Sequence, residues 1–376
     1  MKKFFLIINL VLYVGLLSWA YEPVRIGFNP GESELFDPSI AREGPDGNVY
    51  VFDRKDQLLK VYSPKTGSFL KKIGQPGQGP GEYMSFGSFG FTGNQLFFTE
   101  TQGGHRWITF MDLSGKCDKV LKTQQDGNRG IYTAQILPDN HILAQIEFFG
   151  DSKKHSGYYW NYYQMWLAVI DPQGKISKII IKQDRVFSIG SVPAGIGPRV
   201  PDFPEFLWDV TKEGHIIFSE GNSNVLQVYN LEGKMIGQLK TPLPDAPEFS
   251  IDDLKDWREK RKKEVVQSNG PEFYNKYFSV MDKYIPVYGK KQIIEAILVT
   301  PTGNILIREK KKENSKENQY RLITGKGDLL ATIRTAAKVM TVSKNLILYT
   351  LEDEDENLVL YCLKIEADEK KSLLNL

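Results

Sequence analysis

Short apolar segments alternate with tight polar turns along most of this chain. Six turns rich in Gly, Asn, Asp or Pro each lead into an apolar segment, and these segments begin at Val49, Gln95, His141, His215, Ile305 and Leu346. Turns of this composition between apolar runs are typical of β-hairpins. A further apolar strand and a second turn follow in each of the first five units, with the turns at Gly67, Gly115, Gly174, Gly233 and Gly327. The pattern predicts repeated units of four antiparallel strands.

The second and third strands of each unit are apolar at nearly every position, as in VYVFD at 49–53 and LLKVY at 58–62. This pattern is expected for a sheet that is covered on both faces. Four-stranded sheets repeated radially around an axis cover one another in this way and leave only short edges. The sequence therefore predicts an all-β fold, a six-bladed β-propeller of four-stranded antiparallel blades.

A repeated loop supports the same architecture. The stretch IGQPGQGPGEY at Ile73–Tyr83 has a near copy, IGFNPGESELF, at Ile26–Phe36, and self-similarity at this period is typical of propeller blades. The last unit lacks a clear fourth strand, whereas the N-terminal segment EPVRIGF at 22–28 lies just before the first loop copy. We therefore expect the N-terminal strand to complete blade six and close the ring.

The hairpin DGNVYVFD, the strand LLKVYS and the loop IGQPGQGPGEY together resemble the exported six-bladed β-propeller family related to NHL-type repeats. The resemblance covers nearly all of residues 21–376 and is strongest over Phe36–Met84. It implies the propeller fold and an exported location. It supplies no set of catalytic residues.

The N-terminus predicts export. Lys2 and Lys3 precede an apolar run, and Ser18 and Ala20 fit the small residues before a signal-peptidase site. We expect residues 1–20 to be a signal peptide and residues 21–376 to form the propeller in a periplasm or outside the cell. With the signal cleaved, the protein is not integral to a membrane; retention as an N-terminal anchor is the alternative.

The charge balance argues against a nucleic-acid partner. Removal of residues 1–20 leaves 46 Lys plus Arg against 46 Asp plus Glu, so the broad basic field of a nucleic-acid-binding protein is absent. Cys117 and Cys362 fall in blades two and six, which are not neighbours, and we expect both to be unpaired. The chain is expected to be a monomer.

Insertions are predicted on one face of the disc only. The connections from first to second and third to fourth strand share one face and are short, whereas the other connections share the opposite face, here called the loop face, and hold the insertions. The longest, residues 241–291, has a capping-box-like start at Ser250 and Asp253 and predicts a helical hairpin between blades four and five. Because loops on a rigid scaffold concentrate binding residues, the loop face is the expected working face.

The candidate site combines aromatic and charged residues of these connections. Aromatic side chains offer a large contact area with few rotatable bonds, and charges at the rim orient a partner. The candidate binding residues are Trp107, Arg129, Trp160, Tyr162, Glu220 and Arg308. They predict a non-catalytic interaction propeller for a protein, peptide or glycan, with no catalytic residue and no cofactor. The alternative for the aromatic cluster is ordinary packing of a third strand.

A second function class remains open. Gluconolactonase-like six-bladed hydrolases or lactonases hold Ca²⁺ through oxygen ligands near the axis. The carboxylates that could form such a metal site here are Glu205, Asp209 and Glu295, with Asn128 nearby, although they share no motif. Bound calcium would distinguish this enzyme from the binding propeller.

Overall fold

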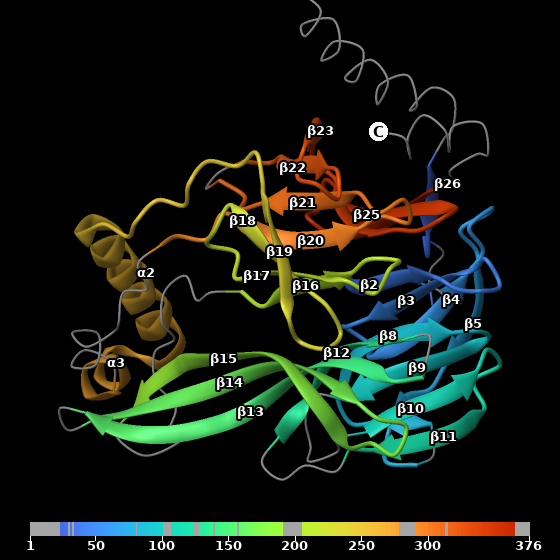
Figure 1. Cartoon of the computed structure of the whole chain (residues 1–376), viewed down its shortest axis with the longest axis horizontal. Helices are drawn as coiled ribbons and strands as arrows, with labels where there is room; N and C mark the ends of the chain where they lie inside the picture. The colour runs from blue at the N-terminus through green and yellow to red at the C-terminus, as the bar shows by residue number, and fades with distance from the viewer. Residues whose placement is uncertain are drawn as a thin grey trace, which may run out of the picture.

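The computed structural model describes residues 23–28, 31, 34–79, 81–100, 107–123, 128–137, 140–155, 158–190, 205–277, 290–312 and 315–364. These residues form six four-stranded antiparallel sheets arranged as the blades of a propeller (Figure 1). The predicted signal peptide lies outside the described residues. Within them, no helix combines the length and apolar character needed to cross a bilayer.

The predicted four-strand units correspond to the blades. The first three blades consist of β2 (Pro38–Glu43), β3 (Val49–Asp53), β4 (Leu58–Tyr62) and β5 (Phe69–Ile73); β8 (Phe86–Thr92), β9 (Gln95–Glu100), β10 (Trp107–Asp112) and β11 (Cys117–Lys122); and β12 (Asn128–Ile136), β13 (Ile142–His155), β14 (Tyr158–Ile170) and β15 (Ile176–Gly190). A short parallel pair, β6 (Gln75–Pro76) and β7 (Glu82–Tyr83), forms within the Gly-Pro loop after blade one.

The remaining blades follow the same order, except that the last one draws a strand from the N-terminus. They consist of β16 (Leu207–Val210), β17 (Ile216–Ser219), β18 (Val225–Tyr229) and β19 (Met235–Lys240); β20 (Ile294–Val299), β21 (Ile305–Glu309), β22 (Asn318–Ile323) and β23 (Leu329–Thr335); and β24 (Lys338–Val342), β25 (Leu346–Glu352), β26 (Leu358–Lys364) and β1 (Val24–Ile26). The first strands surround the central axis, with β2 in contact with both β24 and β8.

Ring closure by the N-terminal strand is confirmed. β1 pairs antiparallel with β26, with Val24 opposite Cys362 and Ile26 opposite Leu360, and forms the outer strand of blade six. Ile26 is 1% exposed and packs with residues of blades one and six. The N-terminal strand therefore joins the two ends of the sequence within one sheet.

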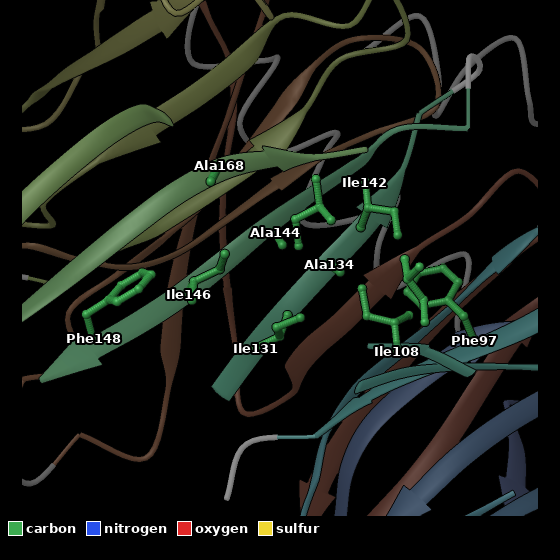
Figure 2. Close-up of a cluster of buried hydrophobic side chains, with 11 residues drawn as sticks. Phe97, Ile108, Ile131, Ala134, Ile142, Ala144, Ile146, Phe148 and Ala168 are labelled. Carbon is green, nitrogen blue, oxygen red and sulfur yellow. The ribbon is translucent and has the colours of Figure 1, made fainter. Parts of the chain in front are cut away.

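The core lies between the faces of neighbouring blades. Figure 2 shows one cluster, in which Phe97 and Ile108 of blade two face Ile131, Ile142 and Ile146 of blade three, with small alanines between them. All five of these side chains are essentially buried. Similar clusters join blades one and two, three and four, four and five, and six and one. This packing explains why the second and third strands are apolar on both faces.

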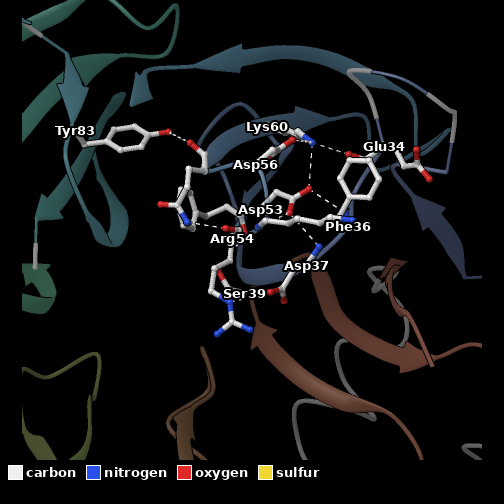
Figure 3. A network of polar contacts seen from close by, with 12 residues as sticks. Glu34, Phe36, Asp37, Ser39, Asp53, Arg54, Asp56, Lys60 and Tyr83 are labelled. Atoms are coloured by element: carbon white, nitrogen blue, oxygen red, sulfur yellow. Dashed lines mark hydrogen bonds and ion pairs between the residues drawn. The ribbon is translucent and has the colours of Figure 1, made fainter. Parts of the chain in front are cut away.

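A buried ion pair fixes the connection from blade six to blade one (Figure 3). Lys60 on β4 is 1% exposed, and its Nζ lies 3.1 Å from Asp53 Oδ2 and 2.6 Å from the carbonyl oxygen of Glu34. Asp53, at the end of β3, is fully buried and accepts hydrogen bonds from the backbone N–H groups of Phe36 and Asp37. The pair thus holds the segment that follows β1.

The predicted helical insertion lies between blades four and five and contains α2 (Ile251–Asn269) and α3 (Pro271–Tyr277). The two helices pack together through Val265 and Tyr274. Residues 278–289 of the predicted helical hairpin lie outside the described residues. The capping box expected from the sequence is present, because Ser250 Oγ accepts from the Asp253 N–H and the Asp253 carboxylate accepts from the Ser250 N–H.

The start of α2 is expected to loosen in acid. Hydrogen bonds from Lys291 and Ser250 lower the pKa of Asp253 to about 2 from its ordinary value of 3.8. Because the folded-state pKa is the lower one, this stabilisation is complete above pH 4 and is lost as the pH falls towards 2. Amide hydrogen exchange of residues 250–258, corrected for intrinsic rates, should rise over that range. An Asp253→Asn variant should show raised exchange already at pH 5; equal exchange in both proteins at pH 5 would contradict this role.

Both cysteines are free, as predicted. Cys117 begins β11 in blade two and is partly exposed, whereas Cys362 lies on β26 and is 1% exposed. Burial, aided by the negative charge of Glu43, raises the pKa of the Cys362 thiol to about 12. We expect iodoacetamide at pH 8 to leave Cys362 unmodified in the folded protein and to alkylate it after denaturation. Mass spectrometry of the Cys362 peptide checks this, and rapid native labelling would contradict it.

Candidate functional site

Elaboration of the loop face is concentrated in two features. In blade three, β13, β14 and β15 continue well beyond the length of the other strands, and in Figure 1 they extend from the disc towards α2 and α3. The helices belong to the connection between β19 and β20, which is on the same face. The opposite face carries short hairpin turns such as those at 45–48 and 302–304. The one-sided distribution predicted from the sequence is therefore present.

The aromatic segment 148–165 is a β-ribbon instead of an irregular loop. Residues of β13 pair with β14 from Phe148 opposite Gln164 to His155 opposite Tyr158, and β15 pairs along the same extension. Aromatic residues favour strands because their side chains suit a pleated surface. Phe148 packs on Trp166 with ring centroids 3.9 Å apart, so Trp166 is part of the blade, in line with the packing alternative.

The six candidate binding residues do not form one cluster in the described structure. Trp107 begins the third strand of blade two, and its ring lies 5.1 Å from Lys122 Nζ on the neighbouring outer strand. Arg308 is on the second strand of blade five, across the axis from blade two, and Glu220 follows the second strand of blade four. These three residues do not contact one another. The backbones of Arg129, Trp160 and Tyr162 lie in β12 and β14, while their side chains are outside the described residues.

Carboxylates at the ends of second strands recur around the loop face. Asp53 and Glu100 both accept backbone N–H groups of the connection that leads into their own blade, from Phe36 and Met84 respectively. Glu220 Oε1 accepts from Gln183 Nε2 at 2.6 Å, which ties β15 to blade four. Glu309 accepts from Gln319 and from Arg321. This repeated arrangement positions connections, and it accounts for Glu220 as a structural contact.

A charged cluster lies around the axis on the loop face, where blades five, six and one meet. Glu295 of this cluster lies on the innermost strand β20. One of its carboxylate oxygens lies 3.4 Å from Arg308 Nε, and the other lies 3.4 Å from Lys310 Nζ. Tyr320 lies near Arg308, and its hydroxyl accepts the N–H of Val339 at 2.9 Å. The cluster is thereby fixed to the connection between blades five and six.

Positive charge exceeds negative charge in this cluster. Lys338 begins β24, and burial followed by repulsion from Arg308 lowers its pKa below the ordinary 10.5, while Glu295 and Asp37 oppose that shift. Arg54 adds a further cation from blade one and pairs with Asp37 at 2.8 Å. The group, which we call the charged mouth, consists of Asp37, Arg54, Glu295, Arg308, Lys310 and Lys338. Four cations against two carboxylates favour an acidic partner.

The carboxylates considered for calcium are not brought together. Asp209 accepts from Gln135 Nε2 and from the Val299 N–H, Glu295 is engaged by Arg308 and Lys310, and Glu205 is exposed. Across the described ranges, no three His, Cys, Asp or Glu residues form a group that could hold a metal ion. The side chain of Asn128 is not among the described parts of the chain.

Four residues of the charged mouth escaped the sequence analysis, namely Asp37, Arg54, Lys310 and Lys338. Each lies at or just beyond the loop-face end of a strand. That position was the available signal, because strand ends on an elaborated face are where a rigid scaffold presents side chains. Their convergence depends on the order of blades around the ring, which brings residues 37 and 54 close to residues 295–338.

Comparison with known proteins agrees with this architecture. Residues 43–97 match the family DUF5128, described as 6-bladed beta-propeller. The chain is a six-bladed β-propeller. No curated protein matches the propeller in sequence. The matched segment runs from the end of β2 through blade one and into β9.

Solved structures share the propeller fold at low identity. A protein of Bacteroides fragilis NCTC 9343 described as exported is 15% identical, with a TM-score of 0.50 and coverage of 92% of this chain and 95% of that one. A DUF4221 family member from Bacteroides vulgatus ATCC 8482 is 9% identical, with a TM-score of 0.52 and coverage of 92% and 96%. A protein described as a gluconolactonase is 10% identical, covers 91% and 92%, and has a TM-score of 0.43, which gives no support for lactonase chemistry.

Proposed function

We propose that this propeller is an exported, non-catalytic interaction protein that binds an acidic protein, peptide or glycan on its loop face. The observation that carries the proposal is the excess of cations at the charged mouth, beneath a face that holds both the β13–β15 extension and the helices α2 and α3. Such cations steer an acidic partner towards the opening and align it there. Trp107, Trp160, Tyr162, Arg129 and Glu220 remain proposed partner contacts on the loop face outside the charged mouth.

The charged mouth can be tested without disturbing the core. Lys310 is 45% exposed and Lys338 is also exposed, so a Lys310→Ala, Lys338→Ala double variant should fold normally. We expect it to lose most binding in a screen of acidic peptides and acidic glycans. The matched control is Lys326→Ala, Lys344→Ala, which removes two exposed lysines from the short-turn face. Equal loss in both variants, or loss in the control alone, would place the binding surface elsewhere.

Export is expected to remove residues 1–20. The Lys2–Lys3 pair, the apolar run and the small residues at Ser18 and Ala20 predict cleavage between Ala20 and Tyr21. Intact mass measurement of the protein recovered from the periplasm or medium should give the mass of a chain that begins at Tyr21. Membrane-bound material that retains Met1 would show that the segment is an anchor.

A further inference from the structure

An open pocket, here called the turn pocket, lies between blades four and five on the face opposite the loop face. Its volume is about 530 Å³, within the range of about 300–1,000 Å³ that is usual for small-molecule sites. Three hairpin turns form its walls, namely those that follow β16, β20 and β22. Its lining includes Lys212, Glu213, Pro301, Thr302, Asn304 and Leu330. The turn pocket is thus separate from the charged mouth.

Contacts between blades fix the walls of the turn pocket. β16 and β20 are neighbouring innermost strands, and the Val299 N–H donates to Asp209 Oδ2 at 2.7 Å beside the turns that follow them. Asp209 is also tied to blade three, because its Oδ1 accepts from Gln135 Nε2 at 2.9 Å. The two turns of blade five approach each other, since a Cβ at Gly325 would lie 3.5 Å from the Gly303 carbonyl oxygen. The scaffold therefore preforms the pocket.

The hydroxyl of Thr302 is available as a hydrogen-bond acceptor in the pocket wall. Thr300 Oγ1 donates to the Asn304 carbonyl oxygen at 3.1 Å, and it lies 2.9 Å from Thr302 Oγ1. Because each hydroxyl carries one proton, Thr302 must be the donor in the second contact. Thr302 is exposed, and the remaining lone pairs of its oxygen can only accept.

The side chain of Asn304 adds donors and a further acceptor. Only the backbone carbonyl of Asn304 is engaged, by Thr300, whereas its amide group has no hydrogen-bond partner among the described residues. A side-chain amide offers two donor hydrogens and one acceptor oxygen. Lys212 and Glu213 contribute one charge of each sign from the turn of blade four. The lining thus offers closely spaced donors and acceptors with balanced charge.

We infer that the turn pocket binds a neutral saccharide unit. Each sugar hydroxyl both donates and accepts, so neighbouring hydroxyls match the acceptor of Thr302 and the mixed groups of Asn304. The C–H face of a pyranose ring is apolar and suits the apolar surface of Pro301 and Leu330. An ionised ligand gains little here, because the charges of the blade-four turn offset each other.

Saturation-transfer NMR with maltose, cellobiose and lactose at pH 7 tests the site. Wild type should bind at least one of these disaccharides. A Thr302→Val, Asn304→Ala double variant should weaken that binding about tenfold or more, because its polar contacts are lost. The matched control is Thr92→Val, Asn94→Ala, which makes the same changes in the Thr-Gly-Asn turn of blade two, outside the pocket lining. The control should bind the disaccharide as wild type does.

Competition identifies the chemistry that the pocket recognises. Glycerol has hydroxyls but no apolar ring face, so it should not displace the bound disaccharide at the concentration at which glucose does. Glucuronate should displace it no better than glucose, because the blade-four turn carries both charges. Equal displacement by glycerol would refute the saccharide assignment, and glucuronate effective at about tenfold lower concentration than glucose would show that Lys212 selects an anion.

The binding data can also overturn the inference directly. Absence of a transfer signal for all three disaccharides excludes the site without reference to a variant. Equal effects of the two double variants would show that the sugar binds elsewhere. Should the Thr302, Asn304 variant fail to fold, Asn304→Ala alone should still weaken binding about fivefold. The Lys310→Ala, Lys338→Ala variant should bind the disaccharide normally, so this inference and the proposed function fail independently.

Discussion

Replacing Asp53 with alanine is expected to lower the free energy of unfolding by about 3–5 kcal/mol, the usual cost of breaking a buried charged pair. Asp53 is fully buried and accepts from Lys60 Nζ and from the N–H groups of Phe36, Asp37 and Lys55. Its removal leaves the Lys60 ammonium group, which is 1% exposed, with only Asp56 and the Glu34 carbonyl as partners. Urea denaturation measured by fluorescence gives the change.

A nearby exposed pair provides the control for this prediction. Asp37→Ala breaks the contact with Arg54, whose side chain is 68% exposed, and should cost about 0–1 kcal/mol because solvent screens such pairs. Lys60→Met combined with Asp53→Ala should cost less than the sum of the two single variants, because neither charge is then left alone. Comparable losses for Asp53→Ala and Asp37→Ala would show that the buried pair does not hold the connection after β1.

The blade pattern was predictable because the residues of each hairpin alone indicate its turn and its strands. The turns before Val49, Gln95 and Ile305 contain Gly or Asn at the points where the chain reverses, and the following residues are apolar on both strand faces. Ring closure was also predictable, since a missing strand at one end and a spare strand at the other have one solution in a closed ring. These features depend on sequence period and turn chemistry, which need no knowledge of long-range contacts.

Polar residues inside the blades were not predictable in the same way. Lys60 stands in the apolar strand LLKVY, where the sequence indicates no partner for it, and it is buried against Asp53. The pairing of Lys60 with Asp53 depends on the fold, because the segment that contains Glu34 and Phe36 packs over the end of β3. Trp160 and Tyr162 were placed in a connection of the loop face, although they lie in strand β14, because aromatic residues fit both a loop surface and a strand.

The position of the long connections was predictable, whereas the residues of the charged mouth were so only in part. The loop face does carry the long connections, and Arg308 does lie at its axial mouth. Trp107 was a candidate contact on the same face, but it begins a third strand, which lies away from the axis. Strand ends can be read from the sequence, whereas the distance of each end from the axis depends on the strand's position within its blade.

Removing the N-terminal strand is expected to have the larger effect of the two stability predictions. A chain that begins at Asp37, compared with one that begins at Tyr21, loses the β1–β26 pairs, the buried Ile26 side chain and the Glu34 and Phe36 contacts to the ion pair. One buried isoleucine contributes about 1.5–3 kcal/mol and each hydrogen bond about 1 kcal/mol, so the expected loss in unfolding free energy is about 5 kcal/mol or more. The exposed edge of β26 should also promote self-association, detectable by size-exclusion chromatography.

A single substitution in the full-length chain tests whether β1 packs against the turn between β4 and β5. Gly67, in the turn between β4 and β5, has φ of +70°, and a Cβ there would lie 1.9 Å from the Arg25 carbonyl oxygen. Gly67→Ala must therefore displace β1. The matched control is Gly303→Ala in another turn, where φ is +84° and no atom lies within 4 Å, so it carries only the backbone strain of about 1 kcal/mol. Gly67→Ala should cost clearly more than Gly303→Ala in urea denaturation, and the excess should vanish in the chain that begins at Asp37, because β1 is then absent. Equal costs in the full-length protein, or an excess that persists after truncation, would mean that β1 is not held against this turn and that ring closure rests on β26 alone.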